Sequence, residues 1–403
     1  MTASIGTSIS QLGFAPVLAF LRSEPSGEIV PDSVLPHFTP EAGSALGGAA
    51  IAAADGIGPP GPVPAARVFP HLGVVYGTVE QVGLSALRAN PAVRAVKPAA
   101  QLSLIRPVTA ARPSDPAGTV WGVEHLRAPE LWAQGWTGAG VRVAHLDTGV
   151  DPTHPCLAGA VVDFAEFDHT GRQVPDAPAR DGDPDHHGTH TAATIAGREI
   201  DGVRVGVAPG AQLCSALVIE GGDITARILG GMDWAVGVGA RVLSMSLGIR
   251  GLVNSFLDLV AILRDNGVLP VVAIGNEGPG TSRSPGNYPT ALSVGAHDRD
   301  GSIAGFSSSQ RFRCRRHPLT PDVVAPGVDV VSAGPHGGWQ TLSGTSMATP
   351  HVAGLAALLM QAHPDAGIDT IERAIVESAE LGTMPAERAN RGEVNGVRAL
   401  ARW

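Results

Sequence analysis

Short apolar segments alternate with helix-like segments from about residue 119 to the end of the chain. The apolar segments include "VRVAHLDTG", "RVLSMSLG", "LPVVAIGN" and "ALSVGAHD", each about as long as one strand. Continuous apolar strands separated by helices predict an α/β fold, in which helices cover both faces of a mostly parallel sheet. In such sheets, functional residues lie at the carboxyl ends of strands and at the N-termini of the helices that follow.

Residues 14–105 show a different pattern. The segments "APVLAFL", "GVVYGTV" and "AVRAVKP" are typical of strands, and "VEQVGLSALRAN" has helical spacing, so we expect a small α+β domain. An Ala-, Gly- and Pro-rich stretch at 38–66 indicates an insertion within it. The proline-punctuated stretch 106–118 predicts a linker, and residues 119–403 predict the second domain.

Composition excludes several classes of protein. With 44% apolar and 16% charged residues among 403, the chain can bury a sizeable core and is not expected to be disordered. The net charge is −9, the only lysine is Lys97 and no long basic stripe is present, so we expect no nucleic-acid partner. No apolar run reaches the roughly 18 residues of a membrane-spanning helix, so we expect no membrane partner.

The N-terminal stretch "MTASIGTSISQLGFAPVLAFLR" has no positive charge before its short apolar segment. It therefore resembles a first strand more than a signal peptide. On this basis we expect a cytoplasmic protein, with secretion by a non-standard route as the alternative.

Three cysteines, Cys156, Cys214 and Cys314, lie far apart in the sequence. An odd and sparse set does not predict a disulfide framework, so small core residues are expected. Cys314 is an open case, because it lies among Arg311, Arg313, Arg315 and Arg316 in the stretch 308–321. The Arg311–Arg316 loop is expected to be either solvated or a docking site for an acidic partner.

Four polar residues occupy the ends of predicted strands or the starts of predicted helices. Asp147 ends an apolar strand in "AHLDTGVD", and His187 begins a helix in "DHHGTHTAATIAG". Asn276 follows a strand in "VVAIGNEG", and Ser346 begins the helix of "SGTSMATPHVAG". Acyl transfer uses these four types: a serine nucleophile, a histidine base, a carboxylate that orients the base and an amide donor for the oxyanion.

Each of these residues alone has a simpler interpretation. A serine at a helix start is usually a cap, and a strand-end Asp or a Gly-Asn-Glu-Gly segment usually belongs to a turn. The stretch "DGDPDHHGTH" also suggests a metal site. Its candidate ligands are Asp181, Asp183, Asp185, His186, His187 and His190. No complete ligand set at zinc spacing follows, so we expect no metal there.

The motifs "DTGVD", "HGTH", "GNEG" and "GTSMATPHVAG", in that order, resemble those of the subtilisin-like serine proteases, the subtilases. The segments "GVAPGAQL", "SMSLG", "NYPTALSVGA" and "DVVAPG" fit the same pattern, and the resemblance covers about 119–400. It implies a subtilisin-like fold and a serine endopeptidase that forms an acyl-enzyme. Asp147, His187 and Ser346 would be its triad, and Asn276 and the Ser346 backbone N–H would bind the oxyanion.

The resemblance further implies that an extended peptide pairs as an added strand between two segments. These are Gly221, Gly222 and Asp223 on one side, and Ser246, Leu247 and Gly248 on the other. Ser246–Gly248 with Ala273, Ile274 and Gly275 would line the pocket before the scissile bond, and Asn287 would lie near its base. None of these pocket residues is acidic, so a neutral or apolar side chain is expected there. Ile228, Leu247 and Phe256 would form the next apolar pocket, or they are ordinary core residues.

Two departures from the family pattern concern calcium. The segment "AGREIDGVRVGVAPG" is short where many subtilases carry a calcium-binding loop, and Cys156 replaces the aspartate expected after "HP". Without that carboxylate a calcium ion loses a strong ligand, so this calcium site is expected to be absent and no cofactor is expected.

The N-terminal domain resembles the inhibitory prosegment of the same family through "LSALRANPAVRAVKP". The resemblance implies a self-inhibited, self-processing precursor whose tail, about Ala99–Arg106, lies in the cleft. We also expect a monomer. Cleavage is expected between about Leu102 and Thr119. Protein or peptide substrates and the chain's own prosegment, bound in cis, are the expected partners. Two other classes stay open: a groove-binding regulatory module and a metal-dependent hydrolase.

Overall fold

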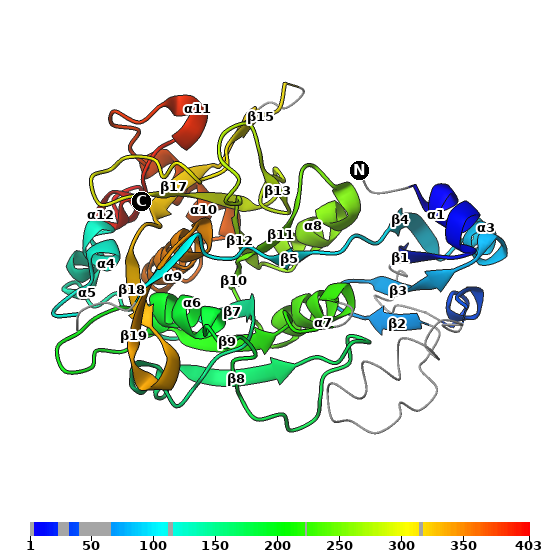
Figure 1. Ribbon diagram of the computed structural model, residues 1–403, viewed down its shortest axis with the longest axis horizontal. Helices are drawn as coiled ribbons and strands as arrows, with labels where there is room; N and C mark the ends of the chain where they lie inside the picture. The colour runs from blue at the N-terminus through cyan, green and yellow to red at the C-terminus, as the bar shows by residue number, and fades with distance from the viewer. Residues whose placement is uncertain (1–3, 23–31, 40–65, 112–115, 222–223, 314–316) are drawn as a thin grey trace.

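A seven-stranded parallel sheet forms the centre of the larger unit in the computed structural model (Figure 1). The structure describes the chain apart from residues 1–3, 23–31, 40–65, 112–115, 222–223 and 314–316. The strand order is β17–β14–β12–β10–β7–β9–β8, and every pair is parallel. The strands are β7 (Arg142–Asp147), β8 (Val161–Glu166), β9 (Gln212–Leu217), β10 (Val242–Met245), β12 (Leu269–Ala273), β14 (Leu292–His297) and β17 (Val323–Pro326). The predicted α/β fold is confirmed.

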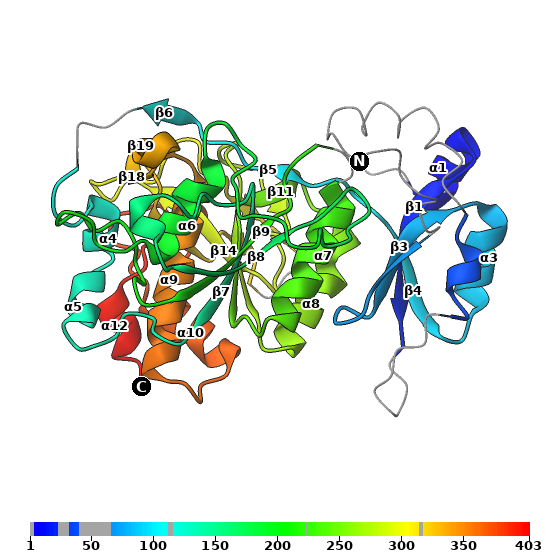
Figure 2. The same cartoon turned by 90° about the horizontal axis from the view of Figure 1, so that it is seen from below.

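Helices cover both faces of this sheet (Figure 2). On one face lie α6 (His187–Ala196), α9 (Thr345–Ala362) and α10 (Ile368–Ser378), and on the other lie α7 (Ile224–Gly237) and α8 (Leu257–Asp265). Successive side chains of a strand point to opposite faces, so each strand contributes to both buried clusters. In β10, for example, Val242 packs with the α9 side and Leu243 packs with the α7 and α8 side.

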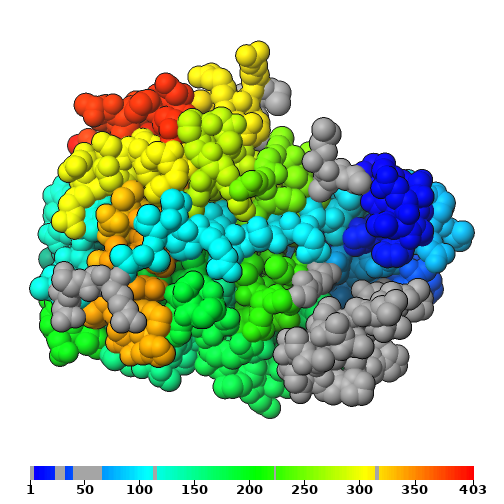
Figure 3. Space-filling model, viewed as in Figure 1, coloured from blue at the N-terminus to red at the C-terminus, as the bar shows by residue number. Residues whose placement is uncertain are grey.

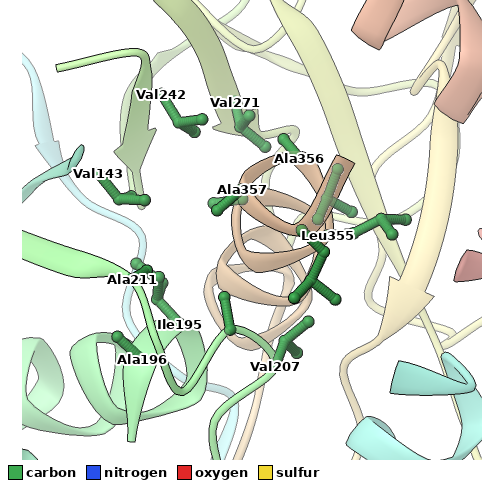
Figure 4. Close-up of a cluster of buried hydrophobic side chains, with 14 of the residues drawn as sticks. Val143, Ile195, Ala196, Val207, Ala211, Val242, Val271, Leu355, Ala356 and Ala357 are labelled. Carbon is green, nitrogen blue, oxygen red and sulfur yellow. The ribbon is translucent and has the colours of Figure 1, made fainter. Parts of the chain in front are cut away.

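The long helix α9 is apolar all round because it lies in the middle of the molecule. Sixteen of its residues, Thr345–Met360, are buried. Its residues Ala356 and Ala357 lie toward Val271 and Val143 of the sheet (Figure 4). This packing fixes where α9 begins, and therefore where Ser346 lies.

The smaller, N-terminal unit is a four-stranded antiparallel sheet of order β2–β3–β1–β4 with two helices. Its elements are α1 (Ile5–Leu12), β1 (Ala15–Leu21), β2 (Ala66–Phe69), β3 (Val74–Val79), α3 (Gln81–Ala89) and β4 (Val93–Pro98). The expected strands and helix are present. Helix α1 lies before the expected domain start at residue 14: the Ser4 side chain caps it, and Ile5 joins the small domain's core.

One face of the N-terminal sheet packs on the helices α7 and α8 of the larger unit (Figure 2). Phe20 and Phe69 share one buried cluster with Ile228 and Phe256. Polar contacts surround this apolar centre. Lys97 Nζ lies 2.8 Å from Asp258 Oδ2, and the backbone N–H of Leu72 donates to Asp233 Oδ1 over 3.0 Å. The two units therefore have a shared core in addition to their covalent link.

The stretch 106–118, expected to be a linker, is partly structured. Strand β6 (Thr109–Ala111) pairs antiparallel with β19 (Trp339–Ser343), which also pairs with β18 (Val330–Ala333). The exposed edge of that hairpin offers backbone groups that β6 satisfies. The expected insertion at 38–66 lies almost entirely outside the described residues.

The remaining elements are short. They are η1 (Leu35–His37), β5 (Ser103–Leu104), α4 (Trp121–His125), α5 (Ala128–Trp132), η2 (Pro155–Leu157), β11 (Leu247–Arg250), η3 (Asn254–Phe256), β13 (Arg283–Ser284), β15 (Gln310–Arg311), β16 (Leu319–Thr320), η4 (Pro335–Gly337), α11 (Ala386–Ala389) and α12 (Gly396–Leu400). Among the described residues, no helix combines the length and apolarity needed to cross a membrane.

The burial of α9 leads to a stability prediction. Leu355→Ala removes a fully buried side chain of α9, on the side of Gly396 and Leu131, and leaves a cavity, so we expect a loss of about 2–5 kcal/mol in the free energy of unfolding. Urea unfolding in a Ser346→Ala background measures it. Leu252→Ala, at a side chain 46% exposed, is the control and should change stability by less than about 0.5 kcal/mol. Equal effects at the two positions would contradict the central role of α9.

Candidate active site

Asp147 and His187 form a buried hydrogen-bonded pair. Asp147 ends β7 and His187 begins α6, and both side chains are 1% exposed. His187 Nδ1 lies 2.7 Å from Asp147 Oδ1, which also accepts from the Thr148 backbone N–H. Since a carboxylate accepts, Nδ1 carries the proton, and the lone pair of the neutral ring lies on Nε2. Nε2 is buried and has no hydrogen-bond partner, so it is available to accept a proton.

Each member of the pair shifts the pKa of the other so that the charged form of both groups is favoured. Burial alone would raise the pKa of Asp147, but the charge and the hydrogen bond of His187 lower it below its usual range. Burial alone would lower the pKa of His187, but the charge and hydrogen bond of Asp147 raise it above 6.5. The imidazolium form of His187 is therefore stabilised in a site that is closed to water.

The acidic stretch next to His187 is occupied by protein hydrogen bonds. Asp181 accepts from the Thr148 hydroxyl (2.7 Å), and from the Thr189 hydroxyl (2.6 Å) and backbone N–H (2.7 Å). Asp181 therefore connects the loop after β7 to the first turn of α6. His190 points elsewhere, since its Nε2 lies 3.0 Å from the Val330 carbonyl. Asp181 and His190 thus each hold α6 against a neighbouring segment.

Ser346 is the second residue of α9, and a proline within this helix, Pro350, changes the hydrogen bonding of the Ser346 carbonyl. Pro350 has no N–H, so it cannot donate the usual helical hydrogen bond to the Ser346 carbonyl. The Ser246 hydroxyl donates to this carbonyl instead, over 3.1 Å. One of the expected substrate-segment residues thus also holds the helix start in place.

Asn276 follows β12 with its amide orientation set by Thr345. The Asn276 side-chain oxygen Oδ1 accepts from the Thr345 backbone N–H and hydroxyl, each over 2.9 Å. The amide nitrogen Nδ2 therefore faces the other way, where it donates to the Arg106 carbonyl over 2.9 Å. This places an N–H donor next to Ser346 and against the tail of the N-terminal unit.

That tail crosses the larger unit as an extended band (Figure 3, cyan). Strand β5 pairs antiparallel with β11, with Ser103 opposite Gly248 and Leu104 opposite Leu247. Ile105 continues this pairing, since its N–H donates to the Ser246 carbonyl over 3.0 Å. Its own carbonyl oxygen accepts from Ser346 Oγ over 2.6 Å. The tail thus brings one peptide carbonyl to the serine.

The side chains of the tail differ in their exposure to solvent. Ile105 is 1% exposed, whereas the next residue, Arg106, has 68% of its side chain exposed. Leu102 is buried in the same cluster as Ile228, Leu247 and Phe256, the residues expected to form the second apolar pocket. The tail therefore buries Leu102 in an apolar cluster, buries Ile105 beside Ser346, and leaves the charged residue in solvent.

Other expected substrate residues are placed less directly. Ala273, Ile274 and Gly275 end β12 beside Asn276, and the first two are fully buried. The Asn287 amide is buried and binds Ser282 and the Gly251 carbonyl, so it also supports its own loop. Gly221 is exposed, while Gly222 and Asp223 lie outside the described residues.

An ion-pair group beside the tail has no strong sequence signal. Arg283 contacts Glu277, and its Nη1 donates to Ser103 Oγ (3.2 Å) and to the Gly248 carbonyl (3.1 Å). Arg250 adds a second contact to Glu277 at 3.3 Å. Glu277 belongs to the motif "GNEG", but Arg250 and Arg283 lie outside the quoted motifs and become adjacent only through the pairing of β11 with β13.

Two of the three cysteines are free and buried, as expected. Burial raises the pKa of Cys156 to about 12 and that of Cys214 to about 11, so both thiols are protonated and unreactive. Cys156, which replaces the calcium-ligating aspartate of the family pattern, has its Sγ 3.2 Å from His154 Nδ1. Cys314 and its neighbours Arg315 and Arg316 lie outside the described residues.

Comparison with known proteins identifies a family and several relatives of this chain. The model of the subtilase family matches residues 138–399. Subtilisin Savinase of Lederbergia lenta is 39% identical over 246 residues, which are 60% of this chain and 85% of that protein. M-protease of Shouchella clausii is 39% identical over 246 residues, 60% of either chain. Subtilisin E of Bacillus subtilis is 37% identical over 250 residues, 60% of this chain and 61% of that protein.

The comparison corrects the expected location. The expectation of a cytoplasmic protein is wrong, because the matching relatives, Savinase and subtilisin E among them, are secreted subtilisins. That expectation depended on the charge pattern at the start of the chain alone, which is a weak signal.

The Asp147–His187 pair leads to a titration prediction. Asp147→Asn removes the charge that raises the pKa of His187, so burial dominates and the pKa should fall from above 6.5 to below it. Histidine carbon NMR across pH, in a Ser346→Ala background, measures both values. Asp185→Asn, at an exposed carboxylate in the same loop, is the control and should leave the titration unchanged. A His187 midpoint below 6.5 in the parent would contradict the pairing.

Proposed function

The chain belongs to the subtilase family and is a subtilisin-like serine endopeptidase, and we propose that Ser346 is its nucleophile. In this proposal His187 is the general base and acid, Asp147 orients it, and Asn276 stabilises the oxyanion. The observation that carries the proposal is the contact of Ser346 Oγ with a peptide carbonyl, that of Ile105. The acceptor nitrogen of the buried Asp147–His187 pair, His187 Nε2, has no hydrogen-bond partner.

The proposed reaction begins with a rotation of the Ser346 hydroxyl from the Ile105 carbonyl toward His187 Nε2. Nε2 takes the hydroxyl proton while Oγ attacks the carbonyl carbon, and the resulting imidazolium is stabilised by Asp147. Asn276 Nδ2 and the Ser346 backbone N–H donate to the oxyanion, which forms near the start of α9. His187 then gives its proton to the leaving amine, and a water molecule hydrolyses the acyl-enzyme by the reverse sequence of proton transfers.

We further propose that the N-terminal unit is a prosegment bound in cis and that the first substrate is the Ile105–Arg106 bond. The strand register supports this bond, because Ile105 is the last residue that pairs with the Ser246–Gly248 segment. The Ile105 side chain is buried, whereas Arg106 is exposed and precedes a proline. For the reaction, Asn276 Nδ2 exchanges the Arg106 carbonyl for that of Ile105.

The same contacts support an apolar preference toward other protein or peptide substrates. A segment that replaces the tail would place an apolar residue where Ile105 lies and a second one where Leu102 lies. The proposed enzyme acts as a monomer, since each group named above comes from one chain.

Self-cleavage tests the nucleophile and the bond together. The wild-type chain should split into two fragments, with Arg106 as the new N-terminus by mass spectrometry, and Ser346→Ala should stay whole. Asn276→Leu should slow cleavage about 10²–10³-fold, a magnitude known for the loss of this donor in a subtilisin. Thr170→Val, at a hydroxyl that binds Asp168 outside the site, is the control. Cleavage of Ser346→Ala at Ile105–Arg106 would overturn the proposal.

The pocket leads to a prediction about specificity. Ile105→Glu places a carboxylate at a position that is 1% exposed, where an unpaired charge is costly, so self-cleavage should slow by more than about 10-fold. Gln101→Glu adds the same charge at an exposed position of the tail and should have little effect. The rates are measured by timed gel analysis at neutral pH. Equal rates for the two variants would place Ile105 outside the pocket.

A further inference from the structure

Three potential metal ligands come together away from the catalytic residues. His125 ends α4, His297 ends β14, and Glu393 bridges to Val324 of β17 and to Glu380. One ligand atom from each residue lies within 4.8 Å of the others. The two imidazole rings are adjacent, with centroids 4.9 Å apart. The cluster therefore joins the segment before β7, the end of a central strand and the C-terminal segment.

His297 has a free nitrogen in this cluster. Its Nδ1 lies 2.8 Å from the Asp298 carbonyl, which only accepts, so Nδ1 carries the proton. Its Nε2 is fully buried and has no hydrogen-bond partner. Burial lowers the pKa of His297 to about 4, which agrees with a neutral ring whose Nε2 carries a lone pair. A backbone carbonyl on one nitrogen and a free lone pair on the other is the arrangement of metal-bound histidines.

His125 and Glu393 form the accessible side of the cluster. His125 Nε2 lies 2.9 Å from Glu393 Oε2, and the two side chains are 27% and 28% exposed. An ion can therefore reach the cluster from solvent. The Trp121 ring packs edge-on against both histidine rings, at 5.9 Å from His125 and 6.1 Å from His297, and so restricts their orientation.

We propose that His125, His297 and Glu393 bind a divalent transition-metal ion of the zinc class. Two imidazole nitrogens and one carboxylate are a known zinc ligand set, with water in the fourth position. Binding breaks the His125–Glu393 hydrogen bond, and the proton on His125 Nε2 leaves to solvent. Tetrahedral bonds of about 2.0–2.2 Å require separations of roughly 3.3 Å between the ligand atoms. His125 Nε2 and Glu393 Oε2 must therefore move apart from 2.9 Å, and His297 Nε2 must approach both of them.

An ordinary ion pair is the simpler explanation of the cluster, but it covers only two members. A His125–Glu393 pair satisfies both of those groups and leaves the buried Nε2 of His297 unpaired, at a cost in free energy. A metal ion satisfies all three. It would also stabilise the folded chain, because the three ligands lie far apart in the sequence and assemble only on folding.

Metal titration of the full-length Ser346→Ala chain, first stripped with a chelator, tests the proposal. Calorimetry with Zn²⁺ should give one ion per chain, and the thermal midpoint should rise in Zn²⁺. Co²⁺ should produce the intense visible absorption of a tetrahedral site. His297→Ala should weaken Zn²⁺ binding by more than about 100-fold, since even the loss of outer-shell partners costs about 10–100-fold.

Two further variants keep the test valid if His297→Ala fails to fold. His125→Gln and Glu393→Gln change partly exposed side chains, and each should abolish the Co²⁺ absorption while the far-ultraviolet circular dichroism stays unchanged. His317→Gln, at an exposed histidine outside the cluster, is the matched control and should bind Zn²⁺ as the parent does. Absence of Zn²⁺ binding in the parent, or binding that survives all three ligand changes, would overturn the proposal.

Discussion

Parallel strand pairing in the central sheet is the constraint on which the site depends. Because β7 and β12 run in the same direction, their carboxyl ends meet one edge, and Asp147 and Asn276 come with them. The buried helix α9 then fixes the position of Ser346, because the apolar side chains of α9 pack closely against the sheet in one arrangement. The relative positions of these three candidate residues are therefore a consequence of core packing rather than of the loops alone.

The same edge explains how the tail is held. Strand β11 follows β10 after one residue and leaves the sheet with unpaired backbone groups, which β5 satisfies by antiparallel pairing. Main-chain hydrogen bonds determine the register of the tail, and the buried side chains of Leu102 and Ile105 fix it further. A one-residue shift that placed Arg106 where Ile105 lies would also move Leu102 to the exposed position of Gln101.

The strands β1, β3 and β4 were predictable because their apolar spacing is local and regular. Asp147, His187, Asn276 and Ser346 were selected because each belongs to a dense motif. Helix α1 was missed because its boundaries are set by Ser4 and Gly13 and not by a strong apolar run. The His125–Glu393 contact spans 268 residues, so no window of sequence could indicate it.

The shared core of the two units has a consequence for the kinetics of the proposed maturation. A tail that is already paired with β11 meets Ser346 at a high effective concentration, set by the fold and independent of dilution. The proposed cut would thus be a first-order event within each molecule, and cutting one peptide bond would leave the Phe20–Phe256 packing intact. The product would be a non-covalent complex, whose dissociation, rather than the cleavage chemistry, would determine when the cleft opens.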